Sequence, residues 1–246
     1  MRWMLLGFGI GAYAIGLMAT APATLVDAGL QRASDGRLRL ADAQGTLWSG
    51  AGQIEMRDAG GRTGAVQSLA WLVRPASLLR GHLVYEVELD QAARRIPVTL
   101  SFSRIELADA EFTLPAAALG LAVPTLAPLR LTGDARLHVE SLSVGRSGMQ
   151  GNATLQWRAA GSALTPVSPL GEYEVRLKDD GAMVQASLRT LQGPLQLDGT
   201  GSWAKGSAPV FLATARIPPQ YQQQLAPLLR LIAVERGAGS FELQVK

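Results

Sequence analysis

The strongest constraint on the fold of this chain is an alternation of apolar and polar residues that recurs along most of its length. It is clearest in six stretches, at 82–90, 98–103, 129–140, 172–178, 195–203 and 241–246. Successive side chains of a β-strand point to opposite faces of a sheet, so this period of two indicates strands with one buried and one solvated face. Strands of that kind belong to antiparallel sheets, and we predict about a dozen of them.

Turn motifs separate the predicted strands, and helical patterns are few. Asp179-Asp180-Gly181 is the sharpest hairpin signal. We expect one longer helix at 218–234, shortened or kinked by Pro227, and short helical turns at 75–79 and near 115–120. The predicted fold class is mainly β, a large curved antiparallel sheet in the form of a trough or an open sandwich.

The N-terminus carries a second constraint. No charged residue occurs from Trp3 to Val26, and Arg2 precedes this apolar run. A run of about 20 apolar residues crosses a bilayer, and its basic end stays in the cytoplasm. We therefore predict a transmembrane signal anchor at 1–23 and a connecting helix at 24–35, with the rest of the chain outside the cytoplasm. The residues that we assign to the membrane anchor are Trp3, Leu5, Phe8, Ile10, Ile15 and Leu17.

A cleaved signal peptide is the alternative interpretation of the same run. Ala19-Thr20-Ala21 and Ala21-Pro22-Ala23 both resemble cleavage sites. Pro22 would follow the first cut, which disfavours it, whereas the second would leave Thr24 as the new N-terminus. Both interpretations place the protein outside the cytoplasm.

Composition excludes several classes of function. The absence of cysteine excludes thiol catalysis and cysteine-based metal sites. The net charge is only +3, and the arginines are scattered among acidic residues, unlike the basic stripe of a nucleic-acid-binding protein. No nucleophile elbow or phosphate-binding glycine loop occurs. We predict no catalytic residues, no metal and no cofactor.

The remaining candidates for chemistry lie on polar strand faces. His82 and His138 have no identifiable third partner for a metal or proton-transfer site. Glu86 with Glu88, and Glu172 with Glu174, are same-strand neighbours on faces that we expect to be solvated, which fits a glycosidase cleft poorly.

Two stretches share an order of features about 90 residues apart, a spacing that suggests a duplicated β unit. In each, a strand ends in a tryptophan, Trp71 or Trp157, and a proline corner and a Leu-Gly pair lead into the next strand. We predict a β domain at 36–246 with repeated halves, 36–115 and 128–217, that continue one sheet, followed by a C-terminal helix and strand. Chance similarity is the alternative, because tryptophan before a turn is common in β proteins.

The same residues carry a family resemblance. Gly45-Thr46-Leu47-Trp48-Ser49-Gly50, Trp71 with Arg74-Pro75 and Leu78-Leu79-Arg80-Gly81, and Gly193-Pro194-Leu195-Gln196-Leu197-Asp198-Gly199 resemble the type II secretion system protein N family. The resemblance implies a bitopic inner-membrane protein with a short cytoplasmic N-terminus and a periplasmic body. It also implies a non-enzymatic component of the general secretion pathway, whose partners are other inner-membrane and periplasmic secretion components and inner-membrane lipid.

The strand pattern also broadly resembles the AsmA-like group of periplasmic β proteins, in which a curved sheet forms an apolar trough. This second resemblance implies an alternative function, a lipid-binding or lipid-handling module with a lipid ligand on the apolar sheet face. The residues that we assign to packing or to partner contact are Trp48, Trp71, Pro75, Gly81, Trp157, Tyr173 and Trp203.

Overall fold

The computed structural model describes most of the chain and divides it into two compact units, Met1–Asp90 and Gln91–Lys246. The described residues are 13, 16–34, 36, 38–57, 63–89, 95–122, 124–145, 148–204, 206–207, 210–237 and 239–245.

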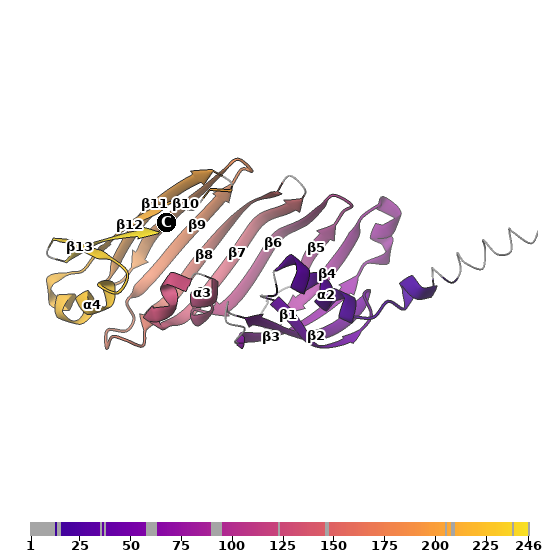
Figure 1. The fold of residues 1–246 in the computed structure, drawn as a ribbon, viewed down its shortest axis with the longest axis horizontal. Coiled ribbons are helices and arrows are strands. Elements are labelled where there is room, and N and C mark those ends of the chain that lie inside the picture. Colours follow the sequence, from indigo (N-terminus) through magenta and orange to yellow (C-terminus); the bar gives the residue numbers. More distant parts are fainter. Residues whose placement is uncertain are drawn as a thin grey trace, which may run out of the picture. The chain divides into compact units, whose positions relative to one another are not determined.

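The first unit combines α2 (Thr24–Ala33) and the 3-10 helix η1 (Pro75–Arg80) with four antiparallel strands (Figure 1). The strands are β1 (Leu38–Gly45), β2 (Ser49–Arg57), β3 (Thr63–Val73) and β4 (Leu83–Leu89). The strands lie in the sheet in chain order, which short hairpin connections favour. The buried residues of the sheet are apolar and include Leu40, Leu69, Trp71, Val73 and Leu89.

The second unit is built on β5 to β14, which lie in chain order except that β14 is inserted between β12 and β13. The strands are β5 (Ile96–Leu100), β6 (Arg104–Pro115), β7 (Leu131–Gly145), β8 (Gly148–Ser162), β9 (Gly171–Asp179), β10 (Met183–Gln192), β11 (Gln196–Ala204), β12 (Phe211–Arg216), β13 (Val234–Gly237) and β14 (Ser240–Val245). Short helical elements connect them: α3 (Ala117–Ala122), η2 (Pro124–Leu129), η3 (Pro219–Tyr221) and α4 (Gln222–Leu229).

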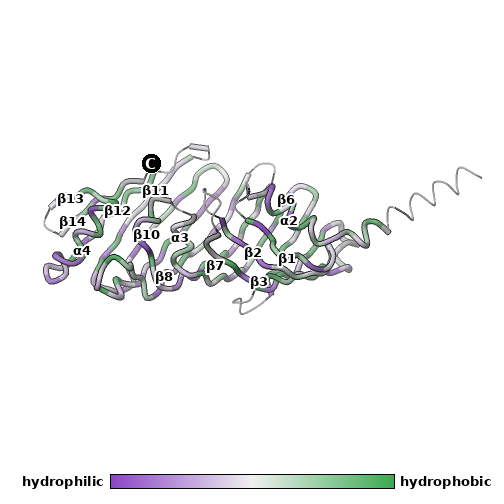
Figure 2. Tube along the Cα trace, turned by 60° about the horizontal axis from the view of Figure 1, so that its bottom comes forward, coloured by the Kyte–Doolittle hydropathy of each residue, from purple (hydrophilic) through white to green (hydrophobic). Residues whose placement is uncertain are grey.

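One face of the second sheet is apolar because the alternation keeps its register from strand to strand. Leu155 on β8 lies opposite Leu137 on β7 and Val175 on β9, and Val175 lies opposite Leu188 on β10. The alternation appears as green and purple segments along the chain (Figure 2). At one end of the strands α4 covers this face, and the buried cluster there consists of Ala116, Leu129, Leu131, Leu170, Leu195, Ala215, Ile217, Leu225, Leu228, Leu229 and Phe241.

The predicted class, mainly β and antiparallel with few short helices, is confirmed. The alternating stretches at 82–90, 172–178 and 195–203 correspond to β4, β9 and β11. Within each unit the described strands belong to a single sheet, so neither unit is a sandwich of two stacked sheets.

Two details of the prediction are wrong. The helix expected at 218–234 ends at Leu229. The chain then forms β13, in which Val234 pairs with Glu242 on β14. The alternation of apolar Val98, Leu100 and Phe102 with polar residues predicts Phe102 on the apolar face, but it lies between β5 and β6 and is 97% exposed.

The predicted anchor falls largely on residues that the structure leaves out. Trp3, Leu5, Phe8, Ile10 and Ile15 lie outside the described residues. Leu17 belongs to the helical segment 16–19 and is exposed. Within the described ranges, no helix has both the length and the apolar character needed to cross a membrane. The anchor stays a prediction, as do the boundaries of the two repeated halves.

Candidate interaction surfaces and pocket

Trp71 packs inside the first unit. Its side chain is buried and its indole Nε1–H donates to the Thr46 carbonyl over 3.1 Å. Gly50 lies directly opposite on β2, where a Cβ atom would overlap the indole ring. The Gly-Thr-Leu-Trp-Ser-Gly stretch therefore needs glycine at position 50 to admit this tryptophan.

Trp157 makes the matching contact in the second unit. Its Nε1–H donates to the Thr132 carbonyl over 2.9 Å, and in both units the acceptor lies 25 residues before the tryptophan. The ring centroid of Trp157 lies 5.6 Å from that of Tyr173. Both units therefore hold a tryptophan by the same contact at the same spacing, and the repeat stays a prediction.

Tyr173 is almost completely buried beside Trp157. Its hydroxyl donates to the Leu195 carbonyl over 2.8 Å. Burial raises the pKa of this phenol well above its ordinary value, since the phenolate would lose its hydration. The residue is therefore a neutral packing and hydrogen-bonding group.

The other residues assigned to packing or contact are less buried. Trp48 is half-buried, and its Nε1–H donates to the Met18 carbonyl over 2.8 Å. Trp203 is half-buried opposite Val184. Pro75 begins η1 and Gly81 follows it with a φ of 76°, a left-handed conformation that glycine adopts without strain; both are exposed. A partner-contact role for any of them stays a prediction.

One of the glutamates expected on a solvated face is buried. Glu174 is 5% exposed, because Arg176 and Arg189 both reach one of its carboxylate oxygens, at 2.7 and 2.8 Å. The position is an ion-paired structural site. Across the described parts of the chain, no three His, Asp or Glu side chains are grouped so that they could hold a metal ion.

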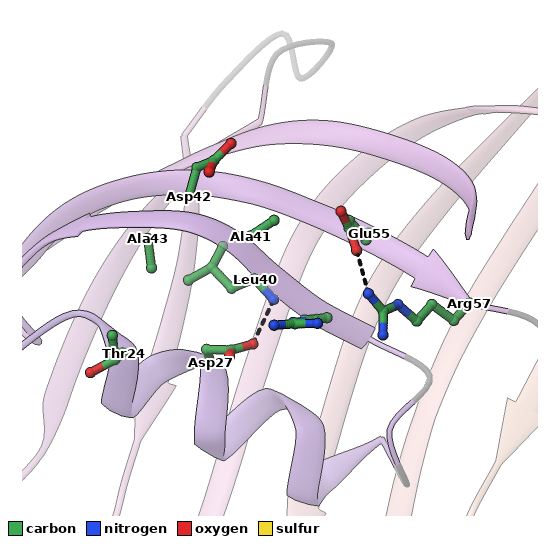
Figure 3. A pocket seen from close by; sticks show the side chains of 9 residues that line it. Thr24, Asp27, Leu40, Ala41, Asp42, Ala43, Glu55 and Arg57 are labelled. Carbon is green, nitrogen blue, oxygen red and sulfur yellow. Dashed lines mark hydrogen bonds and ion pairs between the residues drawn. The ribbon is translucent and has the colours of Figure 1, made fainter. Parts of the chain in front are cut away.

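The outer edge of β1 is capped by α2 and by the segment before it. The Leu40 amide donates to the Asp27 carboxylate over 2.8 Å, a contact drawn in Figure 3. The Leu38 amide donates to Ser34 Oγ over 2.9 Å, and the Ala23 amide donates to the Gly45 carbonyl over 3.2 Å. Edge strands present unpaired backbone groups, and these contacts satisfy three of those on β1.

The outer edge of β13 has no such cap. This strand is the last in the second sheet, and all four of its residues are exposed. Among the residues that the structure describes, only β14 hydrogen-bonds to its backbone. Charged side chains flank the edge in two ion pairs, Arg230–Glu235 and Arg236–Glu242, both at 2.8 Å.

Sequence reasoning missed both edges. Asp27 and Ser34 carried a usable signal, because an acid in the first turn and a serine at the end of a helix are groups that commonly bind backbone amides. β13 carried none, since Val-Glu-Arg-Gly has no alternation of apolar and polar residues.

A pocket of about 430 Å³ lies in the first unit where α2 meets β1 and β2 (Figure 3). Arg57 Nη2 and Glu55 Oε2 form an ion pair at 2.9 Å in its wall. Its lining residues are Thr24, Asp27, Arg39, Leu40, Ala41, Asp42, Ala43, Glu55 and Arg57.

Comparison with known proteins gives one match. The family model described as type II secretion system (T2SS), protein N matches residues 36–244, which include every strand of both units except the last residue of β14. No curated protein and no solved structure matches the chain.

Proposed function

The chain belongs to the type II secretion system protein N family, and we propose that it serves that system as a non-enzymatic assembly subunit. In this role it binds other secretion components and helps to assemble the machine that exports folded proteins across the outer membrane. Family membership supports a place in the secretion machinery. The strand edges and exposed apolar side chains described above are the surfaces on which we base the assembly role.

The proposal includes a location. The uncharged run from Trp3 to Val26 anchors the chain in the inner membrane, with Arg2 on the cytoplasmic side. Both β units then lie in the periplasm, where the absence of cysteine makes the fold independent of disulfide formation.

The observation that carries the proposal is the uncapped edge of β13. A strand of a partner can extend a sheet by pairing with such an edge, and the backbone hydrogen bonds then supply affinity. Val234 and Leu231 are exposed beside it and offer apolar contacts. This edge, with its charged flanks, is the site where we place a secretion partner.

Deletion of the gene in the bacterium that encodes it tests the function. We expect folded secretion substrates to accumulate in the periplasm and secretion to return when the full chain is restored. Normal secretion by the deletion strain would contradict the proposal.

A second candidate, the AsmA-like lipid-handling module, rests on a different observation. Ile105, Val144 and Met149 are neighbours across β6, β7 and β8 on the apolar face, and they are exposed by 45%, 38% and 49%. They lie at the end of the strands away from the buried cluster. Mass spectrometry of organic extracts of the purified protein would decide: a stoichiometric acyl lipid supports this function, and its absence excludes it.

A further inference from the structure

We propose that the pocket between α2, β1 and β2 binds an ammonium–phosphate zwitterion of the phosphoethanolamine type (Figure 3). This inference concerns the first unit alone and does not depend on the assembly role. Three elements build the site: α2 contributes Thr24 and Asp27, β1 contributes residues 39–43, and β2 contributes Glu55 and Arg57.

Two arginines supply donors for a phosphate. Arg57 is half-buried, and its Nε–H is buried with no hydrogen-bond partner, although its Nη2 contacts Glu55. A buried donor without an acceptor is costly and points to a missing partner. Arg39 lies directly opposite Glu55 in the ladder, on the same face as Arg57, and it forms no ion pair within the described residues. Guanidinium groups bind phosphate oxygens through charge-assisted hydrogen bonds.

The charge of the lining argues against a simple anion. Two arginines face three carboxylates, Asp27, Asp42 and Glu55, so the formal balance is +2 − 3 = −1. A ligand that carries an ammonium group beside its phosphate matches both signs. A phosphate alone would leave the carboxylates to repel it.

One carboxylate remains for the ammonium. Asp27 accepts from the Leu40 amide and from Gln31, and Glu55 is paired with Arg57. Asp42 is exposed and has no ion pair or side-chain hydrogen bond in the described chain. It has a φ of 51° where the ladder between β1 and β2 is irregular, and Figure 3 shows it on the other side of Leu40 from Arg57. The pocket therefore offers two arginine donors at one end, beside Asp27 and Glu55, and the Asp42 carboxylate, unpaired in the described chain, at the other.

The zwitterion has two possible sources, a phospholipid headgroup and free phosphoethanolamine. α2 begins at Thr24, within the end of the uncharged N-terminal run, which favours a headgroup at the membrane surface. Both sources present an ammonium group beside a phosphate, but the headgroup diester carries one negative charge and the free monoester carries about −1.5 to −2 at pH 7.

Titration of the purified full-length chain in a maltoside detergent tests the proposal. The probes are free phosphoethanolamine, dihexanoyl phosphatidylethanolamine below its micelle concentration, dihexanoyl phosphatidylglycerol and inorganic phosphate. We expect saturable binding of the two ammonium-bearing probes, and binding of the other two that is weaker by about tenfold or more. Tighter binding of the lipid than of free phosphoethanolamine assigns the source to a headgroup, whereas equal binding assigns it to the soluble compound.

Three variants locate the site. Arg57→Gln should weaken phosphoethanolamine binding about tenfold or more, because a guanidinium–phosphate contact is lost. Asp42→Asn should weaken phosphoethanolamine but leave phosphate unchanged. Arg104→Gln is the matched control, since Arg104 is an exposed, ion-paired arginine on β6, and it should bind like the parent. Circular dichroism checks that each variant is folded.

Three results would overturn the proposal. They are no saturable binding of either ammonium-bearing probe, equal affinity for phosphate and phosphoethanolamine, and equal affinity of folded Arg57→Gln and Arg104→Gln variants.

Discussion

β1 and β13 each lie at the edge of a sheet, but the outer backbone groups of β1 are hydrogen-bonded and those of β13 are not within the described chain. The amide of Leu40 on β1 is satisfied by Asp27 of α2, and that of Leu38 by Ser34, which follows α2. β13 is a four-residue strand that only β14 holds in the described chain, and its flanks carry two ion pairs. Proteins protect sheet edges by covering them, by shortening them or by charging them.

The difference shows which edge is available to a partner. Covering an edge with a helix uses its backbone groups, so a partner strand would first have to displace α2. Shortening and charging an edge leaves the backbone groups free and adds a requirement for complementary charge. The helix α2 thus blocks a partner strand from pairing with β1, whereas the charges beside β13 determine which partner strand can pair with it.

The largest expected effect tests how firmly the β13–β14 hairpin is held. Phe241 on β14 is completely buried, so Phe241→Ala should lower the free energy of unfolding by about 3–5 kcal/mol. Urea unfolding measures this. Val234→Ala, at a position 61% exposed on β13, is the control and should change it by less than about 0.5 kcal/mol. Equal effects of the two changes would show that β13 is packed more tightly than its exposure indicates.

The next effect tests the cap on β1. Asp27→Ala removes the acceptor of the Leu40 amide and should cost about 1–3 kcal/mol. Asp27→Asn keeps an oxygen acceptor and should retain much of that stability. Hydrogen exchange at Leu40 should accelerate in the alanine variant and stay slow in the asparagine variant. Unchanged protection of Leu40 in Asp27→Ala would contradict the assignment of α2 as the cap.

The smallest effect concerns the charges that flank β13. Arg236 and Glu242 are exposed, so a double-mutant cycle of Arg236→Ala and Glu242→Gln should give a coupling energy of only about 0.2–1 kcal/mol. We expect high salt to remove this coupling. A salt-independent coupling above about 2 kcal/mol would mean that the pair is structural, and the edge would then be closed rather than selective.

The parts of the fold that depend on local pattern could be predicted from the sequence. Tyr173, Val175 and Leu177 alternate with polar residues and form β9. The turn after it was also readable, because Asp180 accepts hydrogen bonds from the amides of Ala182 and Met183. The burial of Glu174 on the polar face could not be predicted from the sequence, because Arg189 on the neighbouring strand covers it.

Most of the candidate sites could not be predicted from local sequence patterns. The helical spacing of Leu228, Leu229 and Ile232 continues past Leu229, where α4 ends. The pocket joins Asp27, Asp42 and Arg57 from three elements, and only the register of β1 with β2 and the packing of α2 bring them together. The four tryptophans assigned to packing or contact, in contrast, were found from the sequence, and the indoles of Trp48, Trp71 and Trp157 donate to backbone carbonyls.

In-cell photo-crosslinking most directly tests the claim that β13 receives a secretion partner. A photoreactive residue is placed at Val234 on β13 or, as the matched position, at exposed Gln44 on the capped strand β1. In cells that secrete actively, we predict a discrete crosslink from Val234 to another type II secretion component, and a crosslink from Gln44 that is several-fold weaker or absent. Crosslinks of equal strength from both positions, or from Gln44 alone, would contradict the account.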